Sequence, residues 1–122
     1  MSDPNGELLP YGRQLVDDDD IEAVTKVLRS DYLTTGSNAE KFEAALADRV
    51  GASEAVVCSS GSAALHLAML SLALKPGDIV VVPALTFLAT ANAVRHVGAE
   101  IQFADVNPDT GLMGPDELSQ AI

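Results

Sequence analysis

The sequence contains one cysteine, no tryptophan and only seven Lys and Arg residues among its 122 residues, and these scarcities limit what the protein can be. A single cysteine excludes an internal disulfide and fits a reducing compartment, so we expect a cytoplasmic protein. The 18 Asp and Glu residues give a formal net charge of −11. Nucleic acids and anionic membranes are bound by clusters of Lys and Arg, so neither is expected as a partner.

Long hydrophobic runs are also missing. The most apolar window, residues 63–74, is interrupted by His66 and Ser71 and is too short to span a bilayer. No basic segment followed by an apolar one opens the sequence, so no signal peptide is expected. A length of 122 residues is typical of one domain or part of one.

Hydrophobic periodicity predicts alternating helices and strands after a flexible N-terminus over 1–10. We expect helices after four aspartates at 17–20, from an Asn38 N-cap to Gly51, and over about 62–74, 88–97 and from Pro115. Strands are expected near 55–58 and at 79–82 and 100–104. Because strands and helices alternate with short loops, the sequence predicts an α/β fold whose mostly parallel sheet has helices on both faces.

Three groups of residues that bind metals elsewhere have simpler interpretations here. The four aspartates at 17–20 point around a helix instead of converging, which favours a solvated helix start that complements the helix dipole. Cys58 is interpreted as a buried core thiol in preference to a nucleophile. His66 and His96 have no metal-ligand spacing with Cys58. We expect His66 to face packing or a subunit contact and His96 to lie near a helix end, where it suits the helix dipole. No metal site is predicted.

The segment from Val56 to Leu70 is predicted to be a buried strand that turns sharply into a helix. The turn, Ser59-Ser60-Gly61-Ser62, would place serine hydroxyls and free backbone N–H groups at a helix start, where anions bind readily. Gly61 would let the backbone turn tightly and approach a ligand. A turn of this kind either binds a phosphate or only allows close helix packing.

A second loop, 83–87, follows the next strand at the same sheet edge, where ligands of parallel sheets bind. Its Phe87 is either a core plug or a flat surface for an aromatic ligand. Together, the two loops suit a phosphorylated planar cofactor. The helix over 62–74 is apolar around its whole circumference, so it must be covered on more than one side, by a subunit partner or by another part of the protein.

Five motifs occur in an order that resembles the amino-terminal part of the DegT-type sugar aminotransferases, which are pyridoxal-phosphate (PLP) enzymes that aminate nucleotide-linked keto sugars. The motifs are Tyr32-Leu33-Thr34-Thr35-Gly36, Ser59-Ser60-Gly61-Ser62-Ala63-Ala64-Leu65-His66, Pro76-Gly77-Asp78, Leu85-Thr86-Phe87-Leu88-Ala89-Thr90-Ala91-Asn92 and Asp105-Val106-Asn107-Pro108-Asp109-Thr110. The resemblance covers 11–122 and implies the amino-terminal portion of a fold-type-I aminotransferase large domain. Within the family, Pro10-Tyr11-Gly12-Arg13-Gln14 looks most like the pseudaminic-acid pathway enzyme that aminates a UDP-4-keto-6-deoxy-N-acetylhexosamine.

The resemblance also implies roles for single residues. Ser62 and Ala63 match the residues whose hydroxyl and backbone N–H hold the cofactor phosphate, and Phe87 matches the aromatic residue that stacks on the pyridine ring. The positions that match the sugar-nucleotide site are Tyr11, Asp31, Tyr32, Leu33, Thr34 and Gly61, the last being alanine in many pseudaminic-type members. In the family two subunits complete each active site, so a homodimer is implied.

The implied reaction is transfer of an amino group, usually from glutamate, to the C4 ketone of the sugar. The family's Schiff-base lysine matches no position here and is expected beyond Ile122; Lys26, Lys41 and Lys75 do not match its motif. The 122-residue chain alone is therefore expected to be inactive and to bind the cofactor weakly at most. Two alternatives stay open: a PLP-dependent sugar 3-dehydratase with histidine in place of the lysine, and a non-catalytic sugar-nucleotide-binding or dimerisation fragment.

Overall fold

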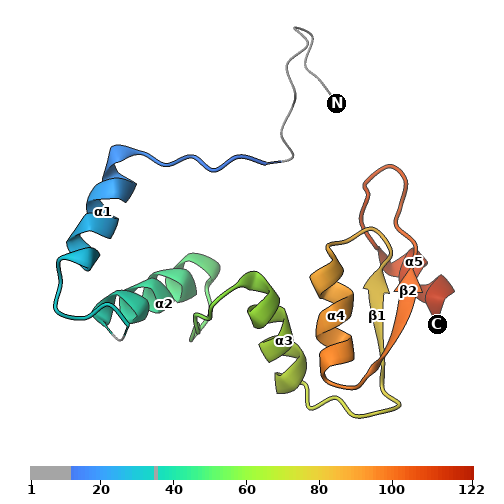
Figure 1. Cartoon of the computed structure of the whole chain (residues 1–122). Helices are drawn as coiled ribbons and strands as arrows, with labels where there is room; N and C mark the ends of the chain where they lie inside the picture. Colours follow the sequence, from blue (N-terminus) through green and yellow to red (C-terminus); the bar gives the residue numbers. More distant parts are fainter. Residues whose placement is uncertain (1–11, 35) are drawn as a thin grey trace, which may run out of the picture. The chain divides into compact units, whose positions relative to one another are not determined.

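The computed structural model describes residues 12–34 and 36–122, and the chain forms two compact units, 1–55 and 56–122 (Figure 1). The predicted flexible segment 1–10 and Tyr11 lie outside the described residues. The first unit contains two helices, and the second contains three helices and two strands. Each count refers to the described residues.

The first helix, α1 (Asp18–Leu28), begins where the aspartate cluster predicts. The backbone N–H of Asp20 donates to Oδ1 of Asp17 at 3.0 Å, and the N–H of Asp17 donates to Oδ2 of Asp20 at 3.2 Å. This reciprocal capping box satisfies two backbone donors that a helix start leaves unpaired. The interpretation of 17–20 as a solvated helix start is confirmed.

The second helix, α2 (Ser37–Val50), begins two residues earlier than the predicted Asn38 N-cap implies. Gly36, in an extended conformation, is its N-cap, and Asn38 lies inside the first turn, so the predicted Asn38 cap is wrong. The helix ends at Gly51, as predicted, because this residue adopts the left-handed conformation (φ 69°) that glycine accommodates without steric cost. Apolar side chains on both helices, including Val24 and Phe42, stay more than half exposed in the described part.

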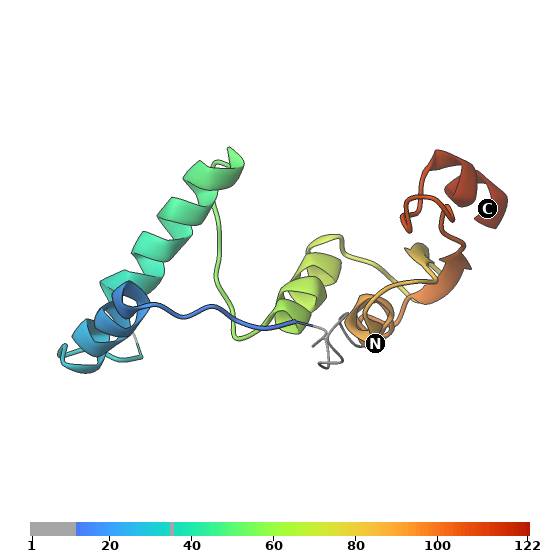
Figure 2. The same ribbon diagram turned by 90° about the horizontal axis from the view of Figure 1, so that it is seen from above.

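The second unit is built on two parallel strands, β1 (Ile79–Pro83) and β2 (Glu100–Ala104), paired from Ile79↔Glu100 to Pro83↔Ala104. The connection between them is α4 (Leu88–His96). Figure 2 shows α4 and α5 (Pro115–Ala121) on opposite sides of these strands. The remaining helix, α3 (Gly61–Ser71), packs against α4. The predicted α/β fold, with parallel strands and helices on both faces, is confirmed for this unit.

The strand predicted near 55–58 is not present. These residues belong to no helix or strand, and the boundary between the two units falls between Ala55 and Val56. A strand is stabilised by pairing with a neighbour, and the sheet of the described part contains only β1 and β2, so 55–58 pairs with neither of them. Val56 is 79% exposed and Cys58 is also exposed, so the predicted buried thiol is wrong for the same reason.

The core of the second unit is small and centres on Val94, Val82 and Ala99, each at most 3% exposed. They come from α4, β1 and the turn before β2, so the core holds both ends of the loop between β1 and α4. α3 has no fully buried residue, and its Leu67 and Leu70 are half exposed. Among the described residues, no helix is long and apolar enough to cross a membrane.

Candidate functional site

At the start of α3, Ser60 and Ser62 have different roles. Ser60 is the N-cap, and its hydroxyl oxygen accepts a hydrogen bond from the backbone N–H of Ala63 at 3.1 Å. The carbonyl of Ser60 accepts from Ala64 at 3.0 Å, which closes the first helical turn. Ser60 therefore stabilises the helix, and Ser62 is free for another role.

Three donors at this helix start have no hydrogen-bond partner in the part of the chain that the structure describes. They are the backbone N–H groups of Gly61 and Ser62 and the hydroxyl of Ser62. No acidic residue lies in the first turn of α3. The positive end of the helix dipole adds to these donors, so the local chemistry favours an anion.

Gly61 lies where the extended backbone turns into α3. Its φ is not among the positive values that favour glycine, because it is the first residue of α3 and has helical geometry. A Cβ added at Gly61 would meet no described atom within 4 Å. The chain turns from extended Ser60 into α3 at Gly61 without a positive φ, and the space in front of this residue is open for a ligand.

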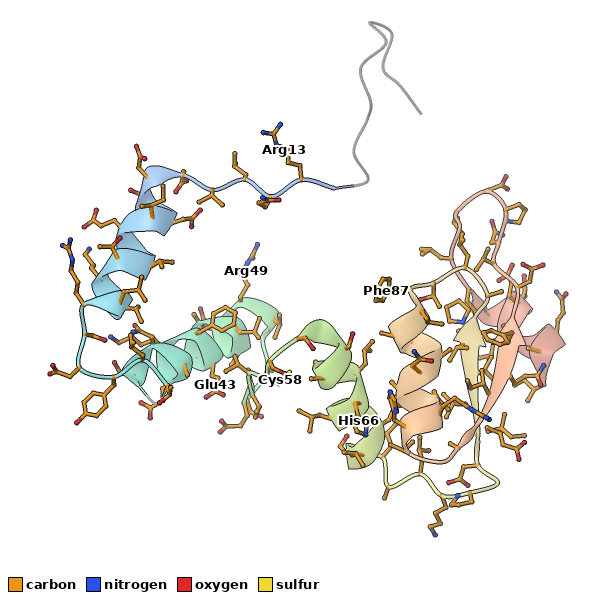
Figure 3. All side chains as sticks on the ribbon, in the orientation of Figure 1. Arg13, Glu43, Arg49, Cys58, His66 and Phe87 are labelled. Carbon is orange, nitrogen blue, oxygen red and sulfur yellow. The ribbon has the colours of Figure 1, made fainter. Side chains whose placement is uncertain are left out.

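The second loop ends at Phe87, the N-cap of α4. The hydroxyls of Thr86 and Thr90 are 2.9 Å apart and share a hydrogen bond across the start of this helix. The Phe87 side chain is 75% exposed and projects from the start of α4, as Figure 3 shows. Phe87 is thus not a core plug in this unit, and one face of its ring can take a ligand.

The two loops meet at one hollow of about 210 Å³ between α3 and α4. Ser62 and Phe87, which the sequence analysis named, both line it, together with Leu88, Ala89, Asn92, Ala93 and His96. The structure thus brings Ser62 of the segment 59–62 and Phe87 of the segment 83–87 to one hollow, and its use as a binding site stays a prediction. Asn92 and His96 were not predicted; their spacing of four from Leu88 places all three on one helix face, which was the available signal.

The residues matched to sugar-nucleotide binding do not all lie in one unit. Asp31, Tyr32, Leu33 and Thr34 belong to the connection between α1 and α2, where Tyr32 and Leu33 are 68% and 61% exposed. Tyr32 and Thr34 line a pocket of about 720 Å³ with Gly36, Ser37, Ala39 and Glu40. Asp31 is exposed beside them, Gly61 lies in the second unit, and Tyr11 lies outside the described residues.

None of the three lysines lines the hollow of Ser62 and Phe87. Lys26 is paired with Glu22 at 2.8 Å on the surface of α1, and it lines a pocket with Lys41 in the first unit. Lys75 lies in the turn before β1, where its backbone N–H donates to Asp78 at 2.7 Å. Within the described ranges, no group of three or more His, Cys, Asp or Glu residues could hold a metal ion. The hollow supplies binding groups without an amine nucleophile.

Comparisons with known proteins agree with this geometry. Residues 14–122 match the model of the DegT/DnrJ/EryC1/StrS aminotransferase family. The chain is 40% identical over 105 residues to the UDP-4-amino-4-deoxy-L-arabinose–oxoglutarate aminotransferase of Shewanella sediminis, a match that covers 86% of this chain and 27% of the relative. It is 38% identical over its whole length to the spore coat polysaccharide biosynthesis protein SpsC of Bacillus subtilis, covering 31% of that protein.

Solved structures give the same result. A putative sugar aminotransferase from Streptococcus pneumoniae, in its PLP form, superposes with a TM-score of 0.84 at 35% identity over 93% of this chain and 29% of that one. The GDP-4-keto-6-deoxy-D-mannose-3-dehydratase of E. coli, with bound hydrated PLP, superposes with a TM-score of 0.84 at 29% identity over 93% and 31%.

The chain thus spans less than a third of the length of these relatives. The family match covers nearly the whole sequence, and it includes the two loops that form the hollow of Ser62 and Phe87. On this evidence, the chain belongs to the DegT/DnrJ/EryC1/StrS aminotransferase family.

Proposed function

We propose that residues 12–122 form the cofactor-phosphate and ring-stacking part of a PLP-dependent enzyme that aminates the C4 ketone of a nucleotide-linked 4-keto-6-deoxy sugar. One observation carries the proposal: the free hydroxyl of Ser62 and the exposed ring of Phe87 line the same hollow. The family to which the chain belongs supports the reaction type, and the solved relative in its PLP form supports the cofactor.

The groups present fit such a cofactor. The N–H groups of Gly61 and Ser62 and the Ser62 hydroxyl can bind phosphate oxygens at the positive end of α3. Phe87, held at the start of α4, offers an apolar face to a planar ring. When bound, PLP supplies an electron sink for the reacting amine. The chain's own residues would thus hold the cofactor by its phosphate group and by one face of its ring, which fixes its orientation.

We place the substrate next to the residues of the α1–α2 connection that the resemblance matches. Tyr32 and Thr34, which line the pocket of the first unit, offer a ring, a phenol and a hydroxyl to a sugar nucleotide, with Asp31 and Leu33 beside them. Tyr11 and Gly61 complete the proposed set. The relative from Shewanella sediminis is an aminotransferase whose name contains a UDP-sugar and oxoglutarate, which supports a UDP-linked sugar and glutamate as donor. The pseudaminic-type sugar is the finer proposal.

The amine-transfer step needs a lysine that the hollow does not contain, since its lining residues include none. We therefore propose that the 122-residue chain binds the cofactor without transferring an amino group. When PLP and then glutamate are added, we expect no visible absorption band that forms with PLP and disappears with glutamate. Appearance of such a band would contradict the proposal, whereas non-specific adducts on Lys26, Lys41 or Lys75 would not respond to glutamate.

The proposed assembly is a homodimer with shared active sites. Its support is the half-exposed leucines of α3, Leu67 and Leu70, which a monomer of this unit leaves in water. Sedimentation velocity over a range of concentrations tests this directly. A monomer at all concentrations would contradict the proposed dimer and leave the cofactor proposal unaffected.

The sugar 3-dehydratase is a second candidate because the E. coli dehydratase superposes as well as the S. pneumoniae aminotransferase does. The product separates the two. Transamination places an amine at C4 and keeps the C3 hydroxyl, whereas dehydration removes the C3 hydroxyl. NMR of the sugar product that an active enzyme containing this chain forms from a UDP-4-keto-6-deoxy sugar and glutamate distinguishes these outcomes.

The experiment that tests the cofactor site uses a chimera in which residues 1–122 replace the matching third of the B. subtilis relative. We expect it to bind PLP, and we expect the double change Ser62→Ala and Phe87→Ala to weaken binding at least about a hundredfold, since both a charged hydrogen bond and ring stacking are lost. Ser71→Ala is the matched control, because its hydroxyl only donates to Ala68 at the other end of α3. Unchanged affinity in the double variant would overturn the proposed site.

A further inference from the structure

The only two histidines of the sequence lie side by side in the second unit. His66 is on α3 and His96 is in the last turn of α4, and their ring centroids are 5.4 Å apart with the planes tilted by 46°. The proposed cofactor chemistry uses neither imidazole. Two metal-binding side chains that are far apart in the sequence thus converge where α3 packs on α4 (Figure 3, which labels His66).

The surroundings leave both rings available to a ligand. Neither imidazole has a hydrogen-bond partner in the described part of the chain, and each has only the other ring as an aromatic contact. His66 is half-buried and His96 is exposed, so solvent and ions reach the pair. His96 also lines the 210 Å³ hollow, which has room for water molecules beside it.

The spacing of the rings suits a shared metal ion. With Zn–N bonds of about 2.0–2.1 Å, two imidazoles bound at the tetrahedral angle have ring centroids about 5 Å apart. The observed separation of 5.4 Å is close to this value. We propose that His66 and His96 bind one divalent transition-metal ion between α3 and α4, with water completing its coordination.

The chemistry of the donors decides the class of metal. Neutral imidazole nitrogen binds Zn²⁺, Cu²⁺ and Ni²⁺ well, whereas Mg²⁺ and Ca²⁺ require oxygen ligands, which this pair does not offer. The net charge of −11 attracts any cation to the chain. Because the pair connects two helices, a bound ion ties α3 to α4 and stabilises their contact.

The site needs no cofactor, so its test is independent of the proposed function. The 122-residue chain is titrated with ZnCl₂ by isothermal calorimetry, in buffer containing excess MgCl₂ to occupy exposed carboxylates such as those at 17–20. Cys58 is the other side chain with affinity for zinc, and it is exposed, so Cys58→Ser is the matched control. Circular dichroism of each variant at zero zinc reports whether the fold is intact.

We expect one zinc ion per chain in both the unaltered protein and Cys58→Ser, with thermal unfolding shifted to higher temperature as zinc is added. We expect His66→Ala and His96→Ala each to abolish both effects, because a single imidazole does not hold the ion. Loss of binding in Cys58→Ser, retention of stoichiometric binding in either histidine variant, or no binding by the unaltered chain would overturn the proposal. If an alanine variant unfolds, His66→Gln and His96→Gln, which keep the side-chain bulk, replace it.

Discussion

The hydroxyl oxygen of Ser60 accepts the backbone N–H of Ala63 at 3.1 Å. The resemblance to sugar aminotransferases assigns this same N–H to the cofactor phosphate. The helix cap therefore already uses one of the donors that the phosphate needs. Either the phosphate displaces the Ser60 hydroxyl, or the unpaired N–H groups of Gly61 and Ser62 hold it instead.

A pair of serine variants separates capping from ligand binding. Ser60→Ala removes the N-cap and is expected to lower the free energy of unfolding by about 1 kcal/mol. Ser62→Ala is expected to leave stability unchanged, because its hydroxyl has no partner in the described structure. The same change should weaken binding of pyridoxamine phosphate about tenfold or more, since a hydrogen bond to a charged group is lost. Urea denaturation and equilibrium dialysis measure the two quantities.

Pyridoxamine phosphate is the suitable probe because it has no aldehyde and cannot react with Lys26, Lys41 or Lys75. If Ser60→Ala weakens its binding as much as Ser62→Ala does, the helix start as a whole matters and the Ser62 hydroxyl has no special role. If Ser62→Ala destabilises the chain and Ser60→Ala does not, the Ser62 hydroxyl has a structural role and is not free for the phosphate.

The helices and strands that the sequence predicted well are those whose ends or composition are determined by residues close together in the sequence. The four aspartates begin α1 by a capping box between Asp17 and Asp20, and Gly51 ends α2 through its own left-handed backbone. The apolar β-branched run at 79–82 became β1 and pairs in parallel with β2. The segment 55–58 has the same kind of composition, but a strand needs a neighbour, and no local pattern shows whether one is present.

The candidate site was predictable only in part, for a similar reason. Ser62 and Phe87 each follow from a local pattern at a helix start, and the parallel topology places their loops at one edge. The involvement of Asn92 and His96 depends on how α4 is rotated against α3. The contact between His66 and His96 depends on the same rotation, so metal-ligand spacing in the sequence did not indicate it.

The packing of the second unit makes a stability prediction with an internal control. Val94 is 1% exposed in α4 and contacts the core around Val82 and Ala99. Val94→Ala is expected to lower the free energy of unfolding by about 2 kcal/mol, since it removes buried methyl groups and leaves a cavity. Val56→Ala makes the same chemical change at a position that is 79% exposed and should have little effect. Equal losses in urea denaturation would show that Val56 is buried by an association of chains.

Gly98 and Gly61 test two different reasons for a glycine: a backbone conformation that other residues rarely adopt, and open space for a ligand. Gly98 has a φ of 82° in the turn before β2, so Gly98→Ala is expected to cost about 1–2 kcal/mol of stability. Gly61 has no such constraint, and a Cβ there meets no described atom within 4 Å, so Gly61→Ala should fold with unchanged stability. Thermal unfolding of both variants measures the contrast. A loss at Gly61 as large as that at Gly98 would show that the fold itself requires glycine there.

The last prediction concerns the ring of Phe87 and uses a second phenylalanine as control. Phe87 is 75% exposed beside Ser62, whereas Phe103, 55% exposed on β2, does not line the hollow. Phe87→Ala is expected to weaken pyridoxamine phosphate binding about tenfold through loss of ring stacking, with stability unchanged because the side chain is not in the core. Phe103→Ala should leave this affinity unaltered. Equilibrium dialysis and urea denaturation of both variants give the answer: unfolding of Phe87→Ala with normal affinity in the folded fraction would make Phe87 a packing residue, as the non-catalytic alternative requires.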